Sequence, residues 1–92
     1  MLNFEWHTEK AIKNIKRHNI TFEEASTAFS DPLSLTIDDP MHSDDEQRFV
    51  LIWESYKDRI LIVIHTERGD NIRIISARKA TKRERAYYES NK

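Results

Sequence analysis

The sequence contains no cysteine, one glycine and only two prolines among its 92 residues. The lack of cysteine excludes a disulfide framework and a thiolate metal site, and it suits a reducing compartment. A single glycine leaves no room for a glycine-rich phosphate-binding loop. No apolar run approaches the roughly 20 residues that cross a bilayer, and the N-terminus lacks the basic and apolar regions of a signal peptide. We therefore expect a soluble, cytoplasmic protein with no membrane contact.

The chain as a whole has no large excess of positive or negative charge, but its separate parts do. The net charge is −1, yet residues 21–58 hold two basic and ten acidic side chains, and residues 67–92 hold eight basic and four acidic ones. Residues 1–20 are also basic, with four basic and two acidic side chains. This segregation predicts that the C-terminal third can meet phosphates, while the acidic middle faces water or a basic partner.

The strongest pattern is a β-hairpin that leads into a basic helix. Two apolar runs, Ile60–Thr66 and Ile72–Ala77, flank a short polar connector that holds the only glycine, as in a hairpin. Thr81 and Glu84 have the spacing of a capping box, which predicts a helix over about residues 82–89. Basic side chains are concentrated where the second strand ends and this helix begins.

The rest of the chain predicts helices first and strands afterwards. We expect a brief strand at Asn3–Trp6, followed by a helix at Thr8–His18 with Ala11, Ile12 and Ile15 on its apolar face and Asn19 as its stop. A second helix should be capped by Thr21 and ended by Asp31-Pro32. Two strands should follow, at Leu33–Ile37 and Arg48–Glu54. The buried stripe of the second helix should be Phe22, Ala25, Ala28 and Phe29. The expected fold class is α+β, with two N-terminal helices, a three- to four-stranded antiparallel sheet and a C-terminal helix in a single domain, residues 1–92.

Three segments, Phe4–Trp6, Thr21–Pro32 and His65–Tyr88, resemble the BrnT toxins of bacterial type II toxin–antitoxin systems. The resemblance implies a RelE-like ribonuclease fold and RNA cleavage that blocks translation. It also implies neutralisation by a cognate BrnA-like antitoxin that binds DNA, so that the toxin meets DNA only through its partner. One departure is His7-Thr8, where relatives usually carry an aspartate that caps the first helix.

A ribonuclease that works without a metal needs a base for the 2′-hydroxyl, cations for the charge at phosphorus, and an acid for the leaving oxygen. Arg78 and Lys79, at the end of a strand, are the best-placed cations, with Arg73 expected on the opposite face of that strand. His65 is the natural proton-transfer group, and Glu67 is a candidate base. The alternatives are that Arg78 is solvated or ion-paired, that His65 is half-buried at a sheet edge, and that Glu67 is merely solvated.

RNA binding is expected from basic and aromatic side chains around this point. Arg83 and Tyr87 lie one helical turn apart and can present a cation beside a ring on which a base stacks. Lys82 and Arg68 add positive charge, whereas Tyr88 is expected to pack on the sheet. A basic face on the first helix could extend the RNA-binding surface or could simply be solvated. The four histidines show no metal-ligand spacing, so neither a metal nor another cofactor is expected.

The same features permit a second function. A non-catalytic module could use the basic end to hold RNA or a protein, and could act within an antitoxin-bound repressor complex. The affinity of such a module for RNA would fall steeply with salt, and the RNA would keep its length because it is not cleaved. The acidic residues Asp44 and Asp45 could then contact basic residues of the antitoxin.

Overall fold

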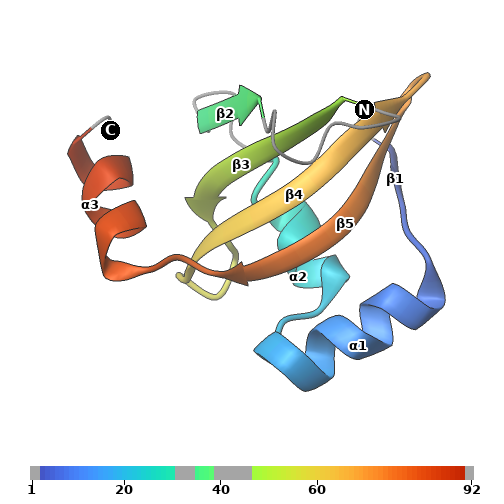
Figure 1. The fold of residues 1–92 in the computed structure, drawn as a ribbon, viewed down its shortest axis with the longest axis horizontal. Helices are drawn as coiled ribbons and strands as arrows, with labels where there is room; N and C mark the ends of the chain where they lie inside the picture. The colour runs from blue at the N-terminus through green and yellow to red at the C-terminus, as the bar shows by residue number, and fades with distance from the viewer. Residues whose placement is uncertain (1–2, 31–34, 39–46, 91–92) are drawn as a thin grey trace.

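The computed structural model describes residues 3–30, 35–38 and 47–90. Along the chain the elements are β1 (Asn3–Glu5), α1 (Thr8–His18), α2 (Phe22–Thr27), β2 (Leu35–Asp38), β3 (Arg48–Glu54), β4 (Ile60–Arg68), β5 (Asn71–Lys79) and α3 (Lys82–Ser90) (Figure 1). The expected helix–sheet–helix order is therefore present. Asp44 and Asp45 lie outside the described residues.

The sheet is larger than the sequence predicted. It has five strands in the order β1-β5-β4-β3-β2, and β1 pairs with β5 in parallel, so the prediction of a three- to four-stranded, wholly antiparallel sheet was wrong. The brief strand β1 joins the sheet because its alternating side chains have partners on both faces. Phe4 packs on Phe29 with ring centroids 5.2 Å apart, and Glu5 accepts a 2.8 Å hydrogen bond from Nε of Arg73.

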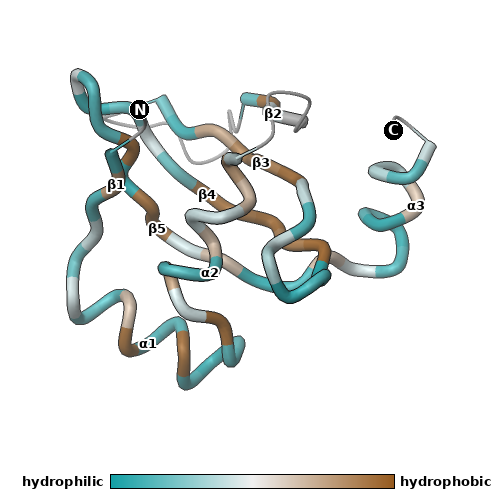
Figure 2. The backbone as a smooth tube through the Cα atoms, turned by 180° about the vertical axis from the view of Figure 1, so that it is seen from behind, coloured by the Kyte–Doolittle hydropathy of each residue, from teal (hydrophilic) through white to brown (hydrophobic). Residues whose placement is uncertain are grey.

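Helices α1 and α2 lie on one side of the sheet, which we call the rear face. In Figure 1 α2 stands behind the strands, and in the reversed view of Figure 2 it stands in front of them. Side chains from α2 and from strands β3, β4 and β5 form the main core there: Ile20, Phe22, Ala25, Ala28, Leu51, Leu61, Val63, Ile74 and Ala77. The predicted stripe of α2 is thus confirmed. The opposite side, the front face, is covered at one end by α3.

Helix α1 turns only part of the predicted apolar face inward: Ala11 packs on the main core, but the two isoleucines do not. Ile12 and Ile15 are 49% and 43% exposed, whereas Asn14 is buried. The Asn14 amide accepts from the backbone N–H of Ala77 at 3.1 Å and donates to its carbonyl at 2.8 Å, and it also donates to the carbonyl of Ile20 at 2.9 Å. β1 pairs only with the first half of β5. Beyond it, the Asn14 amide takes the place of a neighbouring strand and pairs both backbone groups of Ala77.

A β-bulge in β5 changes which of its side chains share a face. Ile64 pairs with Ser76 but His65 pairs with Ile74, so Ile75 is an extra residue that interrupts the alternation. As a result Arg73 lies on the front face together with Ser76 and Arg78. The expectation that Arg73 and Arg78 lie on opposite faces was therefore wrong, because a strict period of two does not hold through a bulge.

The predicted boundaries depend on caps that the structure largely confirms. Asn19 ends α1 in the left-handed region at φ 58°, and the Thr21 hydroxyl accepts from the N–H of Glu24 at 3.0 Å. Helix α2 ends at Thr27, earlier than the predicted stop before Pro32. His7 makes no side-chain cap to α1, as its departure from aspartate suggested.

Candidate functional site

The front face and α3 enclose a groove of about 590 Å³ that we call the front groove. Its floor is aliphatic and its rim near α3 is basic and aromatic. The lining residues are Ile37, Val50, Ile52, Ile62, Ile64, Arg78, Arg83, Glu84 and Tyr87. Three of the site residues expected from the sequence, Arg78, Arg83 and Tyr87, are thus brought together, although they come from a strand and a helix.

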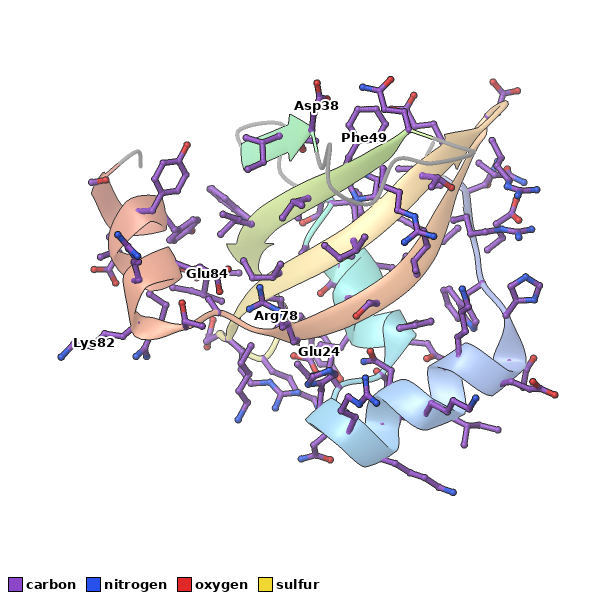
Figure 3. The ribbon with its side chains drawn as sticks, in the orientation of Figure 1. Glu24, Asp38, Phe49, Arg78, Lys82 and Glu84 are labelled. Atoms are coloured by element: carbon purple, nitrogen blue, oxygen red, sulfur yellow. The ribbon has the colours of Figure 1, made fainter. Side chains whose placement is uncertain are left out.

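Arg78 is held at this rim by a bidentate ion pair with Glu84. Its two terminal nitrogens donate to the two carboxylate oxygens at 2.7 and 2.9 Å, and the two side chains meet between β5 and α3 in Figure 3. Glu84 also accepts the backbone N–H of Thr81 at 2.8 Å, which completes the capping box of α3. The bond from Arg78 lowers the pKa of Glu84 to about 2, and Glu84 raises the pKa of Arg78.

The two tyrosines of α3 separate as the sequence predicted. Tyr88 is buried on the front face and meets Trp53 edge-on with ring centroids 5.2 Å apart. Tyr87 is 46% exposed and lines the groove together with Arg83, one turn before it. The buried ring anchors α3 to the sheet, while the partly exposed ring of Tyr87 lines the groove.

The remaining cations of this region point away from the front groove. Lys79 lines a separate hollow of about 280 Å³ with Arg85, Asp58 and neighbouring residues. Lys82 is exposed in the first turn of α3, and in Figure 3 its side chain projects away from the body of the protein. The basic segment therefore divides into side chains that face the groove and side chains that do not.

His65 lies in the interior of the protein and on the rear face. It is 3% exposed, in the central strand β4, with its ring stacked on Phe49 and edge-on to Phe29 at centroid distances of 5.7 and 4.8 Å. Burial lowers the pKa of its imidazole, so the neutral form is favoured. The expectation of a half-buried histidine at a sheet edge was wrong, and the sheet separates His65 from the front groove.

The other sequence candidates lie at the far end of the hairpin. Glu67 and Arg68 are the last residues of β4 before the turn at Gly69-Asp70. On β4, Arg73 pairs with Thr66 and Arg78 pairs with Ile62. These two partners are four residues apart, or about 13 Å. The Arg73 guanidinium binds Glu5, lowers the pKa of that carboxyl, and approaches Nε2 of His7 at 3.2 Å. These residues therefore form no common site with Arg78.

Comparison with known families settles the kind of protein. A family model described as "Ribonuclease toxin, BrnT, of type II toxin-antitoxin system" matches residues 6–84. The chain belongs to the BrnT family. Its fold is also similar to the crystal structure of the Brucella abortus ribonuclease toxin BrnT, with a TM-score of 0.70 at 21% sequence identity, covering 89% of this chain and 100% of that one. None of the curated proteins matches the chain significantly.

The BrnT match includes Arg78, Arg83 and Glu84 and ends before Tyr87. Among the described residues, no group of three histidine, aspartate or glutamate side chains is arranged to hold a metal ion. No helix in the described ranges is long and apolar enough to cross a membrane.

Sequence reasoning missed two parts of this site. Glu84 was recognised only as a capping residue, because six residues across a strand–helix junction match no helical pairing rule. The aliphatic floor was taken as ordinary strand patterning, although alternation already placed Val50 and Ile52 on one face of β3, and Ile62 and Ile64 on one face of β4. The sequence does not indicate that α3 covers only part of the front face of the sheet.

Proposed function

We propose that this BrnT-family protein is an endoribonuclease toxin that cleaves RNA without a metal ion, and that this cleavage blocks translation and growth. The observation that carries the proposal is the convergence of Arg78, Arg83 and Tyr87 on the front groove. The groove holds two guanidinium groups that can bind phosphate oxygens and one exposed ring on which a base can stack. The family description, a ribonuclease toxin, agrees with that chemistry.

The reaction we propose uses positioning and charge more than a strong base. The 2′-oxygen of the RNA attacks the adjacent phosphorus, the bond from phosphorus to the 5′-oxygen breaks, and the products carry a 2′,3′-cyclic phosphate and a 5′-hydroxyl. Arg78 stabilises the negative charge that develops on the phosphoryl oxygens. The titratable groups lining the groove are Arg78, Arg83, Glu84 and Tyr87. Glu84, with a pKa of about 2 and both oxygens bonded to Arg78, is a poor base, so in this proposal water takes the 2′ proton and returns one to the leaving oxygen.

This proposal narrows the set of residues expected from the sequence. Arg78 is the catalytic cation, and Arg83 and Tyr87 bind RNA. Lys79 and Lys82 contribute only long-range charge, because neither lines the groove. His65, Glu67, Arg68 and Arg73 do not line the front groove, so the proposed reaction does not use them.

The antitoxin is the second element of the proposal. A type II toxin has a protein partner, and we propose a DNA-binding, BrnA-like antitoxin that places its own side chains in the front groove. The aliphatic floor supports this part, because apolar side chains of a protein gain from burial there whereas an RNA backbone does not.

Expression of the chain without any partner, followed by mapping of new RNA 5′ ends within minutes, tests the proposal. Discrete 5′-hydroxyl ends and growth arrest are expected, and both should be lost in Arg78→Ala while Arg85→Ala keeps them. Arg85 is the matched control because it is a cation of the adjacent helix that does not line the groove. Purified protein should cleave RNA equally well with a metal chelator present. Cleavage by a folded Arg78→Ala protein at the parental rate would contradict the assigned site.

A second candidate function is supported by the same aliphatic floor. A non-catalytic protein could use the groove only to hold a partner within a repressor complex. It predicts that RNA stays intact in the expression experiment, that growth is normal, and that Ile37→Asp, at a groove residue that is 47% exposed, abolishes binding of the partner without any change in RNA.

A further inference from the structure

A second groove lies between α1 and β5, on the side of the molecule where α1 follows the edge of the sheet. It has a volume of about 290 Å³, and we call it the α1 groove. Its lining residues are Lys10, Lys13, Asn14, Arg17, His18, Ile75 and Ser76. The proposed reaction at the front groove uses none of them.

The α1 groove is basic along its whole length. Lys10, Lys13 and Arg17 follow one another at intervals of three and four residues, so they project from one side of α1. No aspartate or glutamate lines the groove, and within the described ranges these three side chains have no ion-pair or hydrogen-bond partner. These three side chains are exposed and lie beside the packed side of α1, where Ala11 contacts the main core and Asn14 binds β5.

The base of the groove is rigid and polar. Asn14 is fixed by its three bonds to the backbone, so its position does not depend on a ligand. Ser76 lies beside it on β5 with its hydroxyl unbonded among the described residues. A donor hydroxyl between exposed lysine and arginine side chains suits an anion with several oxygen atoms, such as a phosphodiester.

The α1 groove and the front groove are each lined by a residue of β5, Ser76 and Arg78 respectively. Ser76 and Arg78 are on the same face of β5 and two residues, or about 7 Å, apart. Successive phosphates on one strand of a duplex are about 3.4 Å apart along the axis, and at that spacing two or three nucleotides bridge this distance. An acidic protein segment would find the same charge in the α1 groove, but nothing in that position ties it to the proposed reaction.

We propose that the α1 groove is a second binding site for the RNA strand, which holds phosphates two or more nucleotides away from the one that is cleaved. This inference rests on the proposed ribonuclease function and deepens it, because it makes the substrate an extended single strand rather than a dinucleotide. Affinity should therefore depend on the length of the RNA, and the α1 groove should supply the part that salt weakens most.

The test compares two double variants that each remove two positive charges. Lys13→Gln/Arg17→Gln changes the α1 groove, and Lys16→Gln/Lys57→Gln is the matched control at exposed positions that do not line it. Binding is measured with 2′-O-methyl RNA of about 4 and about 12 nucleotides, within the range of single-strand site sizes. This RNA has no attacking hydroxyl, so binding is observed without cleavage, and circular dichroism confirms folding.

The groove variant should bind the longer RNA roughly tenfold more weakly than the control, and the slope of its salt dependence should fall by about 1.4, the value for two lost phosphate contacts. The shorter RNA should bind both variants alike. Equal slopes for the two variants would overturn the inference while leaving cleavage at Arg78 intact. Loss of affinity for a polyglutamate peptide but not for RNA would also overturn it. Failure of the proposed function looks different: RNA binding remains dependent on the α1 groove, but natural RNA is not cleaved.

Discussion

Replacement of Glu84 by glutamine separates the two roles that this residue has in the front groove. Glutamine keeps an acceptor oxygen for the backbone N–H of Thr81, so the capping box of α3 survives. It removes the negative charge that now occupies the guanidinium of Arg78. If Arg78 binds phosphate, Glu84 competes with the substrate, and Glu84→Gln should bind RNA more tightly even though the protein becomes less stable.

The size of the effect follows from the pKa of Glu84. Its lowering from 4.5 to about 2 corresponds, at 1.36 kcal/mol per pKa unit, to about 3.4 kcal/mol. Glu84 and Arg78 are 30% and 38% exposed, so solvent screening reduces this to about 1–2 kcal/mol. Such an energy changes an equilibrium constant by about 5- to 30-fold. Because the pKa is lowered on folding, the stabilisation is present above pH 4.5 and is lost as the pH falls toward 2.

Two assays on the same protein test this reasoning. Urea denaturation should show a loss of about 1–2 kcal/mol for Glu84→Gln at pH 7, shrinking toward zero near pH 2. Binding of 2′-O-methyl RNA should be up to about 5- to 30-fold tighter than in the parent. Glu89→Gln, in the same helix and outside the groove, removes the same charge and is the control. A destabilised Glu84→Gln that binds RNA no more tightly than Glu89→Gln would refute the role of Arg78 in phosphate binding.

Two further predictions concern buried polar residues. Asn14→Ala should lower the free energy of unfolding by about 3 kcal/mol or more, because it leaves the N–H and C=O of Ala77 and the C=O of Ile20 without their partner; a loss below about 1 kcal/mol in urea denaturation would contradict this role. His65 has a lowered pKa in the folded protein, so the unfolded state binds more protons below pH 6.5 and stability should fall there, by at most about 1.36 kcal/mol per pH unit. A folded His65→Phe variant should lose that pH dependence between pH 7.5 and 5.5 and still cleave RNA. Loss of cleavage would show that the reaction needs His65.

Local signals predicted most of the elements, because each depends on neighbours in the chain. The capping residues Thr21 and Thr81 and the left-handed Asn19 fixed helix starts and stops to within a residue or two. The β3 strand was predicted with its observed bounds. By contrast, the parallel pairing of β1 joins residues about seventy positions apart, and a three-residue strand carries no information about its partner.

The candidate site was predicted in part for the same reason. Arg83 and Tyr87 were correctly placed together because helical spacing is a local rule. The pairing of Arg78 with Glu84, and the position of His65 in the interior, depend on how α3 and α2 pack on the sheet. A sequence pattern shows that a histidine lies in a strand, but not which layer covers it.

The extra residue in β5 has a consequence for how this surface can change over time. Since Ile75 shifts the alternation by one, the front-face position of Arg78 depends on the number of residues between Ile74 and Ala77 as well as on their identity. Exchanging Ile75 for another side chain leaves that count intact, whereas deleting it would turn either Arg78 or Ile74 through the sheet. Insertions and deletions in this short segment should therefore be selected against more strongly than substitutions. The number of residues there matters to the site because it determines the face on which Arg78 lies.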